Sequence, residues 1–233
     1  MKYYIAVPTI VAYKELVKCI ETIKESDVPE LDVCIYNNGK NEAIVDFLTQ
    51  LSADERFYYI QAEQNMGCSA SWNIMINRAF MKGADRVLVI NDDLVFADPE
   101  GIKRMMDTSA HNPQSLIIGN VNAFSAFVLT PWVYRLVGEF DEGFWPAYFE
   151  DNDYHYRCKL QGVETIRVEA GIQTEGSASI KTDSSLNQLN GQSFSINRQR
   201  YMDKWGGTPG EEIFLVAWDG KEPNESTKTI MGQ

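Results

Sequence analysis

The segment "RVLVINDDLVFAD" (residues 86–98) places two adjacent carboxylates between apolar runs. Residues 87–90 are aliphatic and mostly β-branched, which favours a buried strand. Asn91, Asp92 and Asp93 follow directly, where two buried charges would be costly without a partner that compensates them. The pattern predicts a strand whose carboxyl end opens onto a polar site. Taken alone, it is also compatible with an acidic turn that leads into the next helix.

The chain before this segment alternates between strand and helix patterns. Residues with strand character are each followed by residues with apolar side chains at helical spacing. The expected strands are 3–8, 31–39, 56–62 and 86–90, and the expected helices are 13–26, 42–52 and 69–83. Ser69 is suited to cap the third helix and Gly83 to end it. The order predicts the α/β class, with a Rossmann-like, mostly parallel central sheet flanked by helices on both faces.

Polar residues stand where each of these strands ends. Parallel sheets of this kind bind ligands along the carboxyl ends of their strands. The residues in question are Pro8-Thr9, Asn37-Asn38-Gly39, Gln64-Asn65 and Asn91-Asp92-Asp93. We therefore expect these side chains to converge on one crevice.

The second half of the chain is less regular. Strands are expected within 115–130 and 163–170, and helices over 131–140, 149–162 and 198–207. Residues 174–199 are rich in Ser, Asn, Gln and Gly with few apolar anchors, which predicts a mobile loop or lid. The polar tail, residues 220–233, is expected to be loose. Residues 1–219 are expected to form a single domain.

The composition limits the class of protein. Of the 233 residues, 44% are hydrophobic and 23% are charged, as in ordinary globular proteins. The net charge of −12 argues against an extended nucleic-acid-binding surface, but a bound divalent cation would still allow a small anionic ligand. The chain has no apolar run long enough to span a membrane, no signal-peptide pattern and no CxxC pair. These features predict a cytoplasmic protein without a transmembrane segment.

Several kinds of site are excluded by their missing motifs. The chain has no GxGxxG after the first strand, no GxxxxGK[ST] and no GxSxG. Its two histidines differ in context: His111 is expected in an exposed loop, whereas His155 lies in an acidic helix and is either a surface residue or a substrate contact. Carboxylates and a metal remain, because Asp92 and Asp93 offer hard oxygen ligands suited to Mg²⁺ or Mn²⁺.

A second acidic cluster lies in "YFEDNDYHYR" (residues 148–157). Glu150 and Asp151 would stand at the start of a helix, where the helix dipole favours anions. They could simply cap the helix, and Asp153 with Arg157 could be a surface ion pair. However, they follow the aromatic-rich "EFDEGFWPAYF", and aromatic walls around a carboxylate suit a sugar pocket in which a base takes a hydroxyl proton.

The order of these motifs resembles the inverting family-2-type glycosyltransferases of the GT-A fold, in particular the small rhamnosyltransferase-like branch. The resemblance covers residues 3 to 207. The matching motifs are "VPTI" (7–10), "YNNG" (36–39), "QNMGCSASWN" (64–73), "VINDDLVF" (89–96), "GEFDEGFWPAYFEDNDYHYRCKLQG" (138–162), "EGSAS" (175–179) and "SINRQRYMDKWGG" (195–207).

The resemblance implies a metal-dependent transfer of a sugar from a nucleotide-sugar donor to a glycan or other hydroxyl-bearing acceptor. Asp151 would be the catalytic base beside Glu150, and Asp93 would hold Mn²⁺ or Mg²⁺. Residues of about 1–98 would form the nucleotide-binding half, and residues of about 99–219 the acceptor-binding half. The implied donor-binding residues are Pro8, Thr9, Asn38, Asn65, Gly67, Asn73, Asn91, Asp92 and Arg157.

The sequence departs from the family at two points that matter: the DXD-like motif begins with Asn91 rather than Asp, and a metal-binding His is missing. Relatives often carry a metal-binding His before the "GS" stretch, whereas this chain reads "IQTEGSAS" (172–179). Glu175 or the segment 174–199 would have to take its place. The missing His also leaves open an alternative function, in which the chain is a catalytically silent module that binds a nucleotide or glycan on the same fold.

Overall fold

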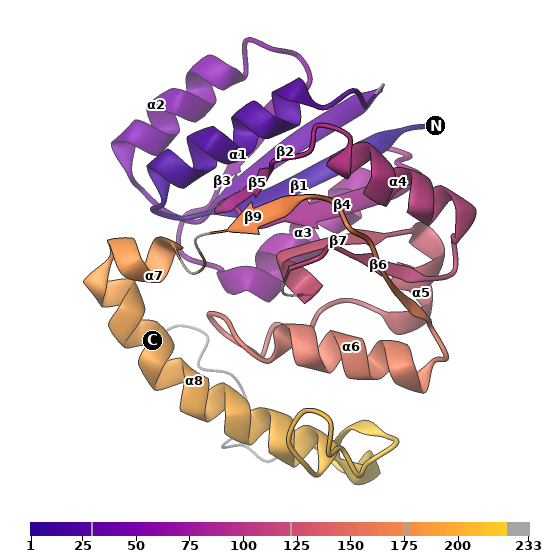
Figure 1. Ribbon diagram of the computed structural model, residues 1–233. Helices are drawn as coiled ribbons and strands as arrows, with labels where there is room; N and C mark the ends of the chain where they lie inside the picture. The colour runs from indigo at the N-terminus through magenta and orange to yellow at the C-terminus, as the bar shows by residue number, and fades with distance from the viewer. Residues whose placement is uncertain (29, 122, 175, 177, 223–233) are drawn as a thin grey trace.

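A seven-stranded sheet in the order β3-β2-β1-β4-β7-β6-β8 forms the centre of the molecule (Figure 1). The computed structural model describes residues 1–28, 30–121, 123–174, 176 and 178–222. The strands are β1 (Tyr3–Thr9), β2 (Leu31–Asn37), β3 (Phe57–Gln61), β4 (Arg86–Ile90), β6 (Leu116–Ile118), β7 (Ala126–Leu129) and β8 (Thr165–Arg167). Strands β3, β2, β1 and β4 run parallel, and β7 is antiparallel to β4. The predicted α/β class with a mostly parallel sheet is confirmed.

Helices cover both faces of this sheet, as the alternation predicted. Two apolar clusters fill the spaces between the sheet and the helices, one on each face. The first face carries α1 (Tyr13–Glu25), α2 (Glu42–Leu51) and α4 (Gly101–His111), and the second carries α3 (Gly67–Met81), α5 (Pro131–Val137) and α6 (Glu150–Leu160). The periodic apolar residues of each helix thus face the sheet.

The start of α3 differs from the expectation that Ser69 caps it. The helix begins at Gly67, and Ser69 lies inside the first turn with its hydroxyl buried and without a hydrogen-bond partner among the described residues. Asn65 starts the helix earlier, because its Oδ1 accepts a hydrogen bond of 2.9 Å from the Gly67 N–H. Gly83 follows the end of the helix with a φ of +79°, as predicted for a terminating glycine.

A second, two-stranded sheet was not anticipated. Strand β5 (Leu94–Phe96) pairs antiparallel with β9 (Ile172–Thr174), so that Leu94 stands opposite Thr174. The inward side chains Leu94, Phe96 and Ile172 are buried in the first apolar cluster. The pairing places Thr174 beside Leu94 and therefore close to Asp93. The two strands are far apart in the sequence, so no local pattern reveals that they pair.

The prediction of a loop over 174–199 is wrong for most of that segment. Helix α7 (Ala178–Thr182) is followed by the long helix α8 (Ser184–Trp205), which lies along the outer edge of the molecule (Figure 1). Asp183 caps α8 by accepting hydrogen bonds from the backbone N–H groups of Ser185 and Leu186. The helix has no continuous apolar stripe, and its buried apolar anchors, Tyr201 and Trp205, lie near its C-terminal end. Of the predicted loose tail, residues 223–233 lie outside the described residues.

Buried ion pairs attach the C-terminal end of α8 to α6. Asp153 of α6 is fully buried and accepts hydrogen bonds from Arg157 at 2.9 Å and from the Trp205 indole at 2.9 Å. Lys204 of α8 approaches Asp153 at 2.5 Å and Asp141 at 2.8 Å. Asp153 and Arg157 therefore form part of a buried network rather than the surface ion pair that the sequence allowed.

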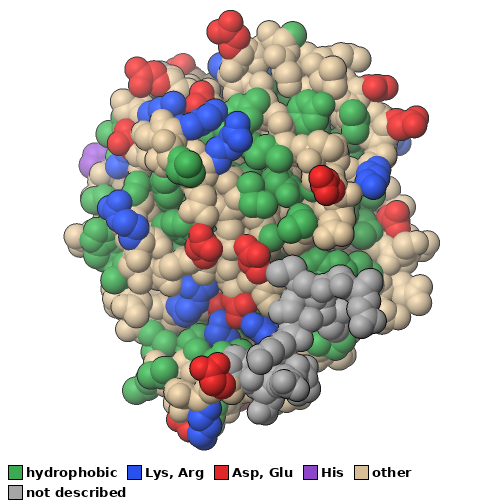
Figure 2. Space-filling view, turned by 180° about the vertical axis from the view of Figure 1, so that it is seen from behind, with side chains coloured by type: hydrophobic (Ala, Val, Ile, Leu, Met, Phe, Trp, Pro, Cys, Tyr) green, Lys and Arg blue, Asp and Glu red, His purple; other side chains and the backbone are tan. Residues whose placement is uncertain are grey.

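On the rear face of the molecule, Lys and Arg side chains lie in small groups beside Asp or Glu (Figure 2). The part of this face that the described residues form carries no continuous basic surface. That distribution agrees with the net charge of −12. Among the described helices, none combines the length and the apolar character needed to span a bilayer.

Candidate active site

A cavity of about 340 Å³ opens at the carboxyl ends of β1, β2 and β4. Its walls also come from the first turns of α3 and α6 and from α7 and α8. The structure brings all of the predicted site residues into this lining except Asn73 and Arg157. The predicted residues that line it are Pro8, Thr9, Asn38, Asn65, Gly67, Asn91, Asp92, Asp93, Glu150 and Asp151.

The two adjacent carboxylates after β4 have different surroundings. Asp92 is buried, and its Oδ2 accepts a hydrogen bond of 2.6 Å from the Thr9 hydroxyl. Burial, with a smaller contribution from the charge of Asp93, raises the pKa of Asp92 to about 7. Asp93 is only partly buried, and its Oδ2 accepts one hydrogen bond of 3.2 Å from the Ala178 N–H. Asp93 is thus the carboxylate that is more open to a ligand.

Asn38 joins the end of β2 to the start of α3. Its Oδ1 accepts a hydrogen bond of 2.9 Å from the Met66 N–H, and its Nδ2 donates one of 2.7 Å to the Ser71 hydroxyl. Each group retains capacity for a further bond, since an amide has two N–H donors and two oxygen lone pairs. Asn38 can therefore both shape this wall and contact a ligand.

Gly67 permits a close approach of the opposite wall. Its φ is +79°, and a Cβ at this position would lie 2.8 Å from the carbonyl oxygen of Pro146. The neighbouring Cys68 N–H donates a hydrogen bond of 2.8 Å to that same oxygen. A side chain at residue 67 would push the two walls apart, which explains why glycine is required there.

Glu150 and Asp151 begin α6 at the other side of the cavity. Glu150 is buried, and its Oε2 has no hydrogen-bond partner among the described residues. Burial, reinforced by the negative charge of Asp151, raises the pKa of Glu150 well above its ordinary value. Burial also raises the pKa of Asp151, although the Asn152 N–H stabilises its carboxylate with a hydrogen bond of 2.8 Å. The two groups together favour one proton on Glu150 and a charge on Asp151.

The turn before this acidic pair is held in an unusual conformation. Tyr148 and Phe149 have φ values of +77° and +72°, a region that costs a non-glycine residue about 1–3 kcal/mol. The Phe149 ring packs against Tyr201 and Phe194 of α8, with ring centroids 5.8 and 5.2 Å apart. These contacts pack the turn directly before Glu150 against α8.

Asn73 and Arg157 have structural contacts in place of the donor contacts that the resemblance implied. Asn73 is buried in α3 and holds the chain at Phe140 by hydrogen bonds of 2.8 and 2.9 Å to its backbone. Arg157 binds Asp153 and donates a hydrogen bond of 2.7 Å to the carbonyl oxygen of Val137. Neither residue lines the cavity. Sequence position along a helix could not show that these side chains face another element.

Other lining residues were not predicted as site residues. They come from the short 3-10 turn before β7, from the aromatic-rich segment before α6 and from helices α7 and α8, where the sequence offered at most a general aromatic signal. The main ones are Tyr148, Pro146, Phe124, Ser179, Leu186 and Asn190. His155 is exposed on α6, with its ring 6.4 Å from that of Phe124. His111 is the last residue of α4 and does not lie in the loop that was expected.

The charged side chains in the described lining of the cavity are all acidic. Asp92, Asp93, Glu150 and Asp151 all face this cavity, and the lining among the described residues contains no Lys or Arg. An anionic ligand such as a diphosphate would be repelled unless a cation entered with it. The cavity is therefore suited to a ligand that arrives with a divalent ion.

The donor set fits an ion shared with a ligand better than an ion held by the protein alone. No group of three His, Cys, Asp or Glu side chains among the described residues is arranged to hold a metal. Mg²⁺ and similar ions are commonly held by one or two carboxylates, with phosphate oxygens and water completing the shell. Asp93, beside Asp92, offers such a set. Glu175, the suggested substitute for the missing His, lies outside the described residues.

A family model decides the broader assignment. The model for glycosyl transferase family 2 matches residues 4–170. The chain belongs to this family. The matched region includes the strand ends after β1, β2 and β4 and both acidic pairs, so the cavity is built largely from the family 2 domain. Among curated proteins, no match was found.

Solved structures show the same GT-A glycosyltransferase fold. The family 2 chain is similar to the mannosyltransferase PcManGT from Pyrobaculum calidifontis in complex with GDP-Man and Mn²⁺, with 10% identity and a TM-score of 0.59 over 73% of this chain and 55% of that one. It is also similar to S. aureus TarS 1–349 in complex with UDP-GlcNAc, with 13% identity and a TM-score of 0.59 over 72% and 56%. The chain thus spans about half the length of these proteins.

Proposed function

We propose that the chain is a metal-dependent inverting glycosyltransferase that moves a sugar from a nucleotide-sugar to an acceptor hydroxyl. The observation that carries this proposal is the pairing of two acidic clusters across one cavity that has no Lys or Arg among its described lining residues. The pair after β4 suits the metal and diphosphate, and the pair at the start of α6 suits the acceptor. Membership of glycosyl transferase family 2 supports the same division.

On the donor side, Asp93 would hold Mn²⁺ or Mg²⁺, with Asp92 beside it. When bound, such an ion neutralises negative charge on a departing diphosphate. Pro8, Thr9 and Asn38 would border the nucleotide at the ends of β1 and β2. One solved structure of similar fold contains GDP-Man with Mn²⁺ and another contains UDP-GlcNAc, which supports a nucleotide-sugar with a divalent ion as the donor-side ligand.

On the acceptor side, Asp151 would act as the base. Its carboxylate takes the proton of the acceptor hydroxyl while that oxygen forms a bond to the anomeric carbon of the donor sugar. The bond from the same carbon to the diphosphate breaks on the opposite face, which inverts the configuration. Protonated Glu150 would donate a hydrogen bond into the cavity without competing for the acceptor proton.

Direct binding measurements test this proposal. We expect calorimetric titration with UDP, GDP and dTDP to give binding by at least one of them in the presence of Mn²⁺. The matching nucleotide-sugars, including dTDP-rhamnose because of the rhamnosyltransferase-like motifs, should then be hydrolysed or transferred. Binding without turnover of any donor would instead identify a silent binding module, and no binding at all would refute the donor site.

Removal of the metal should abolish most donor binding. Because the described lining supplies no cationic side chain, we expect EDTA to weaken binding of the nucleotide diphosphate by about tenfold or more, which corresponds to about 1.4 kcal/mol or more of binding free energy. Added Mn²⁺ should restore it. Asp93→Asn should reduce the Mn²⁺-dependent part of the binding, whereas Asp54→Asn, at an exposed ion pair with Arg56, should not. Equal binding with and without EDTA would contradict the assignment of Asp93.

The pH dependence of sugar transfer should show the titration of Asp151, the proposed base. Burial raises the pKa of Asp151, and the base is active only when it is deprotonated. As pH falls, kcat/KM should therefore decline at a higher pH than an ordinary aspartate would give, by about tenfold per pH unit below the apparent pKa. A full pH–rate profile would show this acid limb. An acid limb that lies at or below the usual pKa of aspartate would contradict the role of Asp151.

A further inference from the structure

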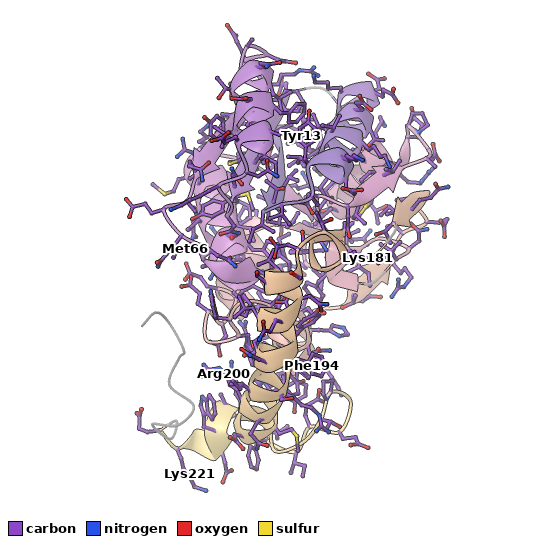
Figure 3. All side chains as sticks on the ribbon, turned by 90° about the vertical axis from the view of Figure 1, so that its left-hand side faces the viewer. Tyr13, Met66, Lys181, Phe194, Arg200 and Lys221 are labelled. Carbon is purple, nitrogen blue, oxygen red and sulfur yellow. The ribbon has the colours of Figure 1, made fainter. Side chains whose placement is uncertain are left out.

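Helix α8 continues the wall of the cavity outward. Leu186 and Asn190 of α8 line the cavity, and Phe194 follows at the same four-residue spacing. Residues four apart lie on one face of a helix, so these three side chains form a row along one side of α8. Figure 3 shows Phe194 and, further along, Arg200 on α8, with Lys181 of α7 near its other end.

Phe194 is exposed and yet fixed in place. Its side chain is 44% exposed, an unusual state for a phenylalanine. Its ring meets those of Tyr148 and Phe149 with centroids 5.4 and 5.2 Å apart. Tyr148 itself lines the cavity. The result is an aromatic surface that extends from the cavity lining at Tyr148 to Phe194 and is open to water on one side.

The exposed part of α8 is uncharged, unlike an ordinary solvent-facing helix. Residues 184–197 contain no Asp, Glu, Lys or Arg, and their polar members are Ser, Asn and Gln. Most of these side chains are exposed. Asn190 makes no side-chain hydrogen bond among the described residues, so its amide is available to a ligand. At about 1.5 Å per residue, this stretch is about 21 Å long.

These features together match the chemistry of an uncharged saccharide. A sugar ring presents apolar C–H faces that pack on aromatic rings, and hydroxyl edges that exchange hydrogen bonds with amide and hydroxyl side chains. A polyanionic acceptor would instead require Lys or Arg along its path. A lipid surface would favour a broader apolar face than a row interrupted by Asn190.

We propose that the α8 row, defined as Leu186, Asn190 and Phe194 with Tyr148 beside it, is an acceptor subsite for an uncharged oligosaccharide. This inference rests on the proposed function, because it makes the ligand of α8 the acceptor of the same reaction. The non-reducing or reducing end that carries the reactive hydroxyl would enter the cavity towards Asp151. The following sugar units would lie on Phe194 and along the neutral face of α8.

Oligosaccharide binding without any donor tests the subsite. Tetrasaccharides of glucose, mannose, galactose, rhamnose and N-acetylglucosamine are compared with tetragalacturonate and with phosphatidylcholine vesicles, by saturation-transfer NMR and titration. We expect at least one uncharged tetrasaccharide to bind. Phe194→Ala should weaken that binding by about tenfold, the scale expected for loss of an aromatic anchor. Absence of binding by the whole uncharged panel, or binding only to tetragalacturonate or to vesicles, would overturn the proposal.

The chain offers a matched control on the same helix. Ile196 is 46% exposed but lies two residues from Phe194, about 200° around the helix axis. Ile196→Ala should therefore leave oligosaccharide binding within about twofold, a change too small to reflect loss of an anchor. An equal effect of both substitutions would overturn the assignment of Phe194.

A second variant protects the test against misfolding. Since Phe194 also packs on the turn before α6, Asn190→Ala provides a change that removes only an amide from a partly exposed helical position. It should weaken oligosaccharide binding while the thermal unfolding temperature is retained. Nucleotide diphosphate binding is measured in parallel. If nucleotide binding fails while oligosaccharide binding responds as expected, the proposed transferase function is wrong and the saccharide subsite stands. The reverse pattern refutes only the subsite.

Discussion

Replacement of Asp151 by Asn should reduce sugar transfer by about 10²–10⁴-fold in kcat, the usual contribution of a positioned general base. The physical reason is that an amide cannot accept the proton of the acceptor hydroxyl, although it retains the shape of the side chain. Binding of the nucleotide diphosphate should stay within about twofold, because Asp151 belongs to the proposed acceptor side of the cavity. Steady-state kinetics and calorimetric titration on the same protein preparation would measure both quantities.

Glu150→Gln is the matched control for that variant. Burial and the charge of Asp151 raise the pKa of Glu150 well above its usual value, so glutamine resembles the protonated form that the structure favours. We expect a loss at least about tenfold smaller than that of Asp151→Asn, because the neutral hydrogen-bonding group is preserved. If Glu150→Gln were the more damaging substitution, Glu150 rather than Asp151 would be the base.

Replacement of Asp153 by Asn should give the largest loss of stability. The side chain is fully buried between Arg157, Lys204 and the Trp205 indole. Removing one member of a buried ion pair leaves the others uncompensated and costs about 3–5 kcal/mol. For a chain of this size, about 2–4 °C is lost per kcal/mol, so the unfolding temperature should fall by about 6–20 °C. Thermal denaturation followed by circular dichroism would measure the change.

The same experiment has a control at an exposed ion pair of equal spacing. Lys103 and Asp107 form an i,i+4 pair at 2.6 Å, with side chains 42% and 44% exposed. Exposed helical pairs contribute about 0.3–0.5 kcal/mol, so Asp107→Asn should shift the unfolding temperature only slightly. Similar shifts in the two variants would mean that Asp153 is not the centre of a buried network. Because Asp153 anchors α8, Asp153→Asn should also weaken binding of the proposed acceptor more than binding of the nucleotide donor.

The central sheet could be predicted because its signals are local. Each of β1, β2 and β4 carries a continuous apolar run, and each intervening helix repeats apolar residues at its own period. Parallel strands then bring their carboxyl ends to one edge whatever the details of the loops. This is why the sequence alone predicts that Pro8, Asn38 and Asp93 lie together, as they do in the lining of the cavity.

The acidic pairs were recognised as candidates, and the family resemblance implied different roles for the members of each pair, but the physical difference in their surroundings could not be read from the sequence. Asp92 and Asp93 are identical in the sequence, and only the Thr9 hydroxyl from another strand and the Ala178 N–H from α7 distinguish them. The same holds for Glu150, whose raised pKa depends on burial by elements that are distant in the chain. The pKa of a carboxyl group depends on the groups that surround it, and tertiary contacts bring those groups together.

The sequence by itself determined the α/β alternation, the polar strand ends and the positions of the two acidic pairs, because hydrophobic periodicity and turn residues act over a few residues. Only the tertiary structure decided that the helix predicted from residue 198 begins as early as Ser184, that Asn73 and Arg157 serve other elements, and that β5 pairs with β9. Tyr201 and Trp205 pack against α6 and stabilise the C-terminal end of α8. The uncharged N-terminal part of α8 lies beside the cavity. Tertiary contacts between distant segments outweigh the weak helix propensity of this stretch, which is the physical reason that no local pattern predicted a helix there.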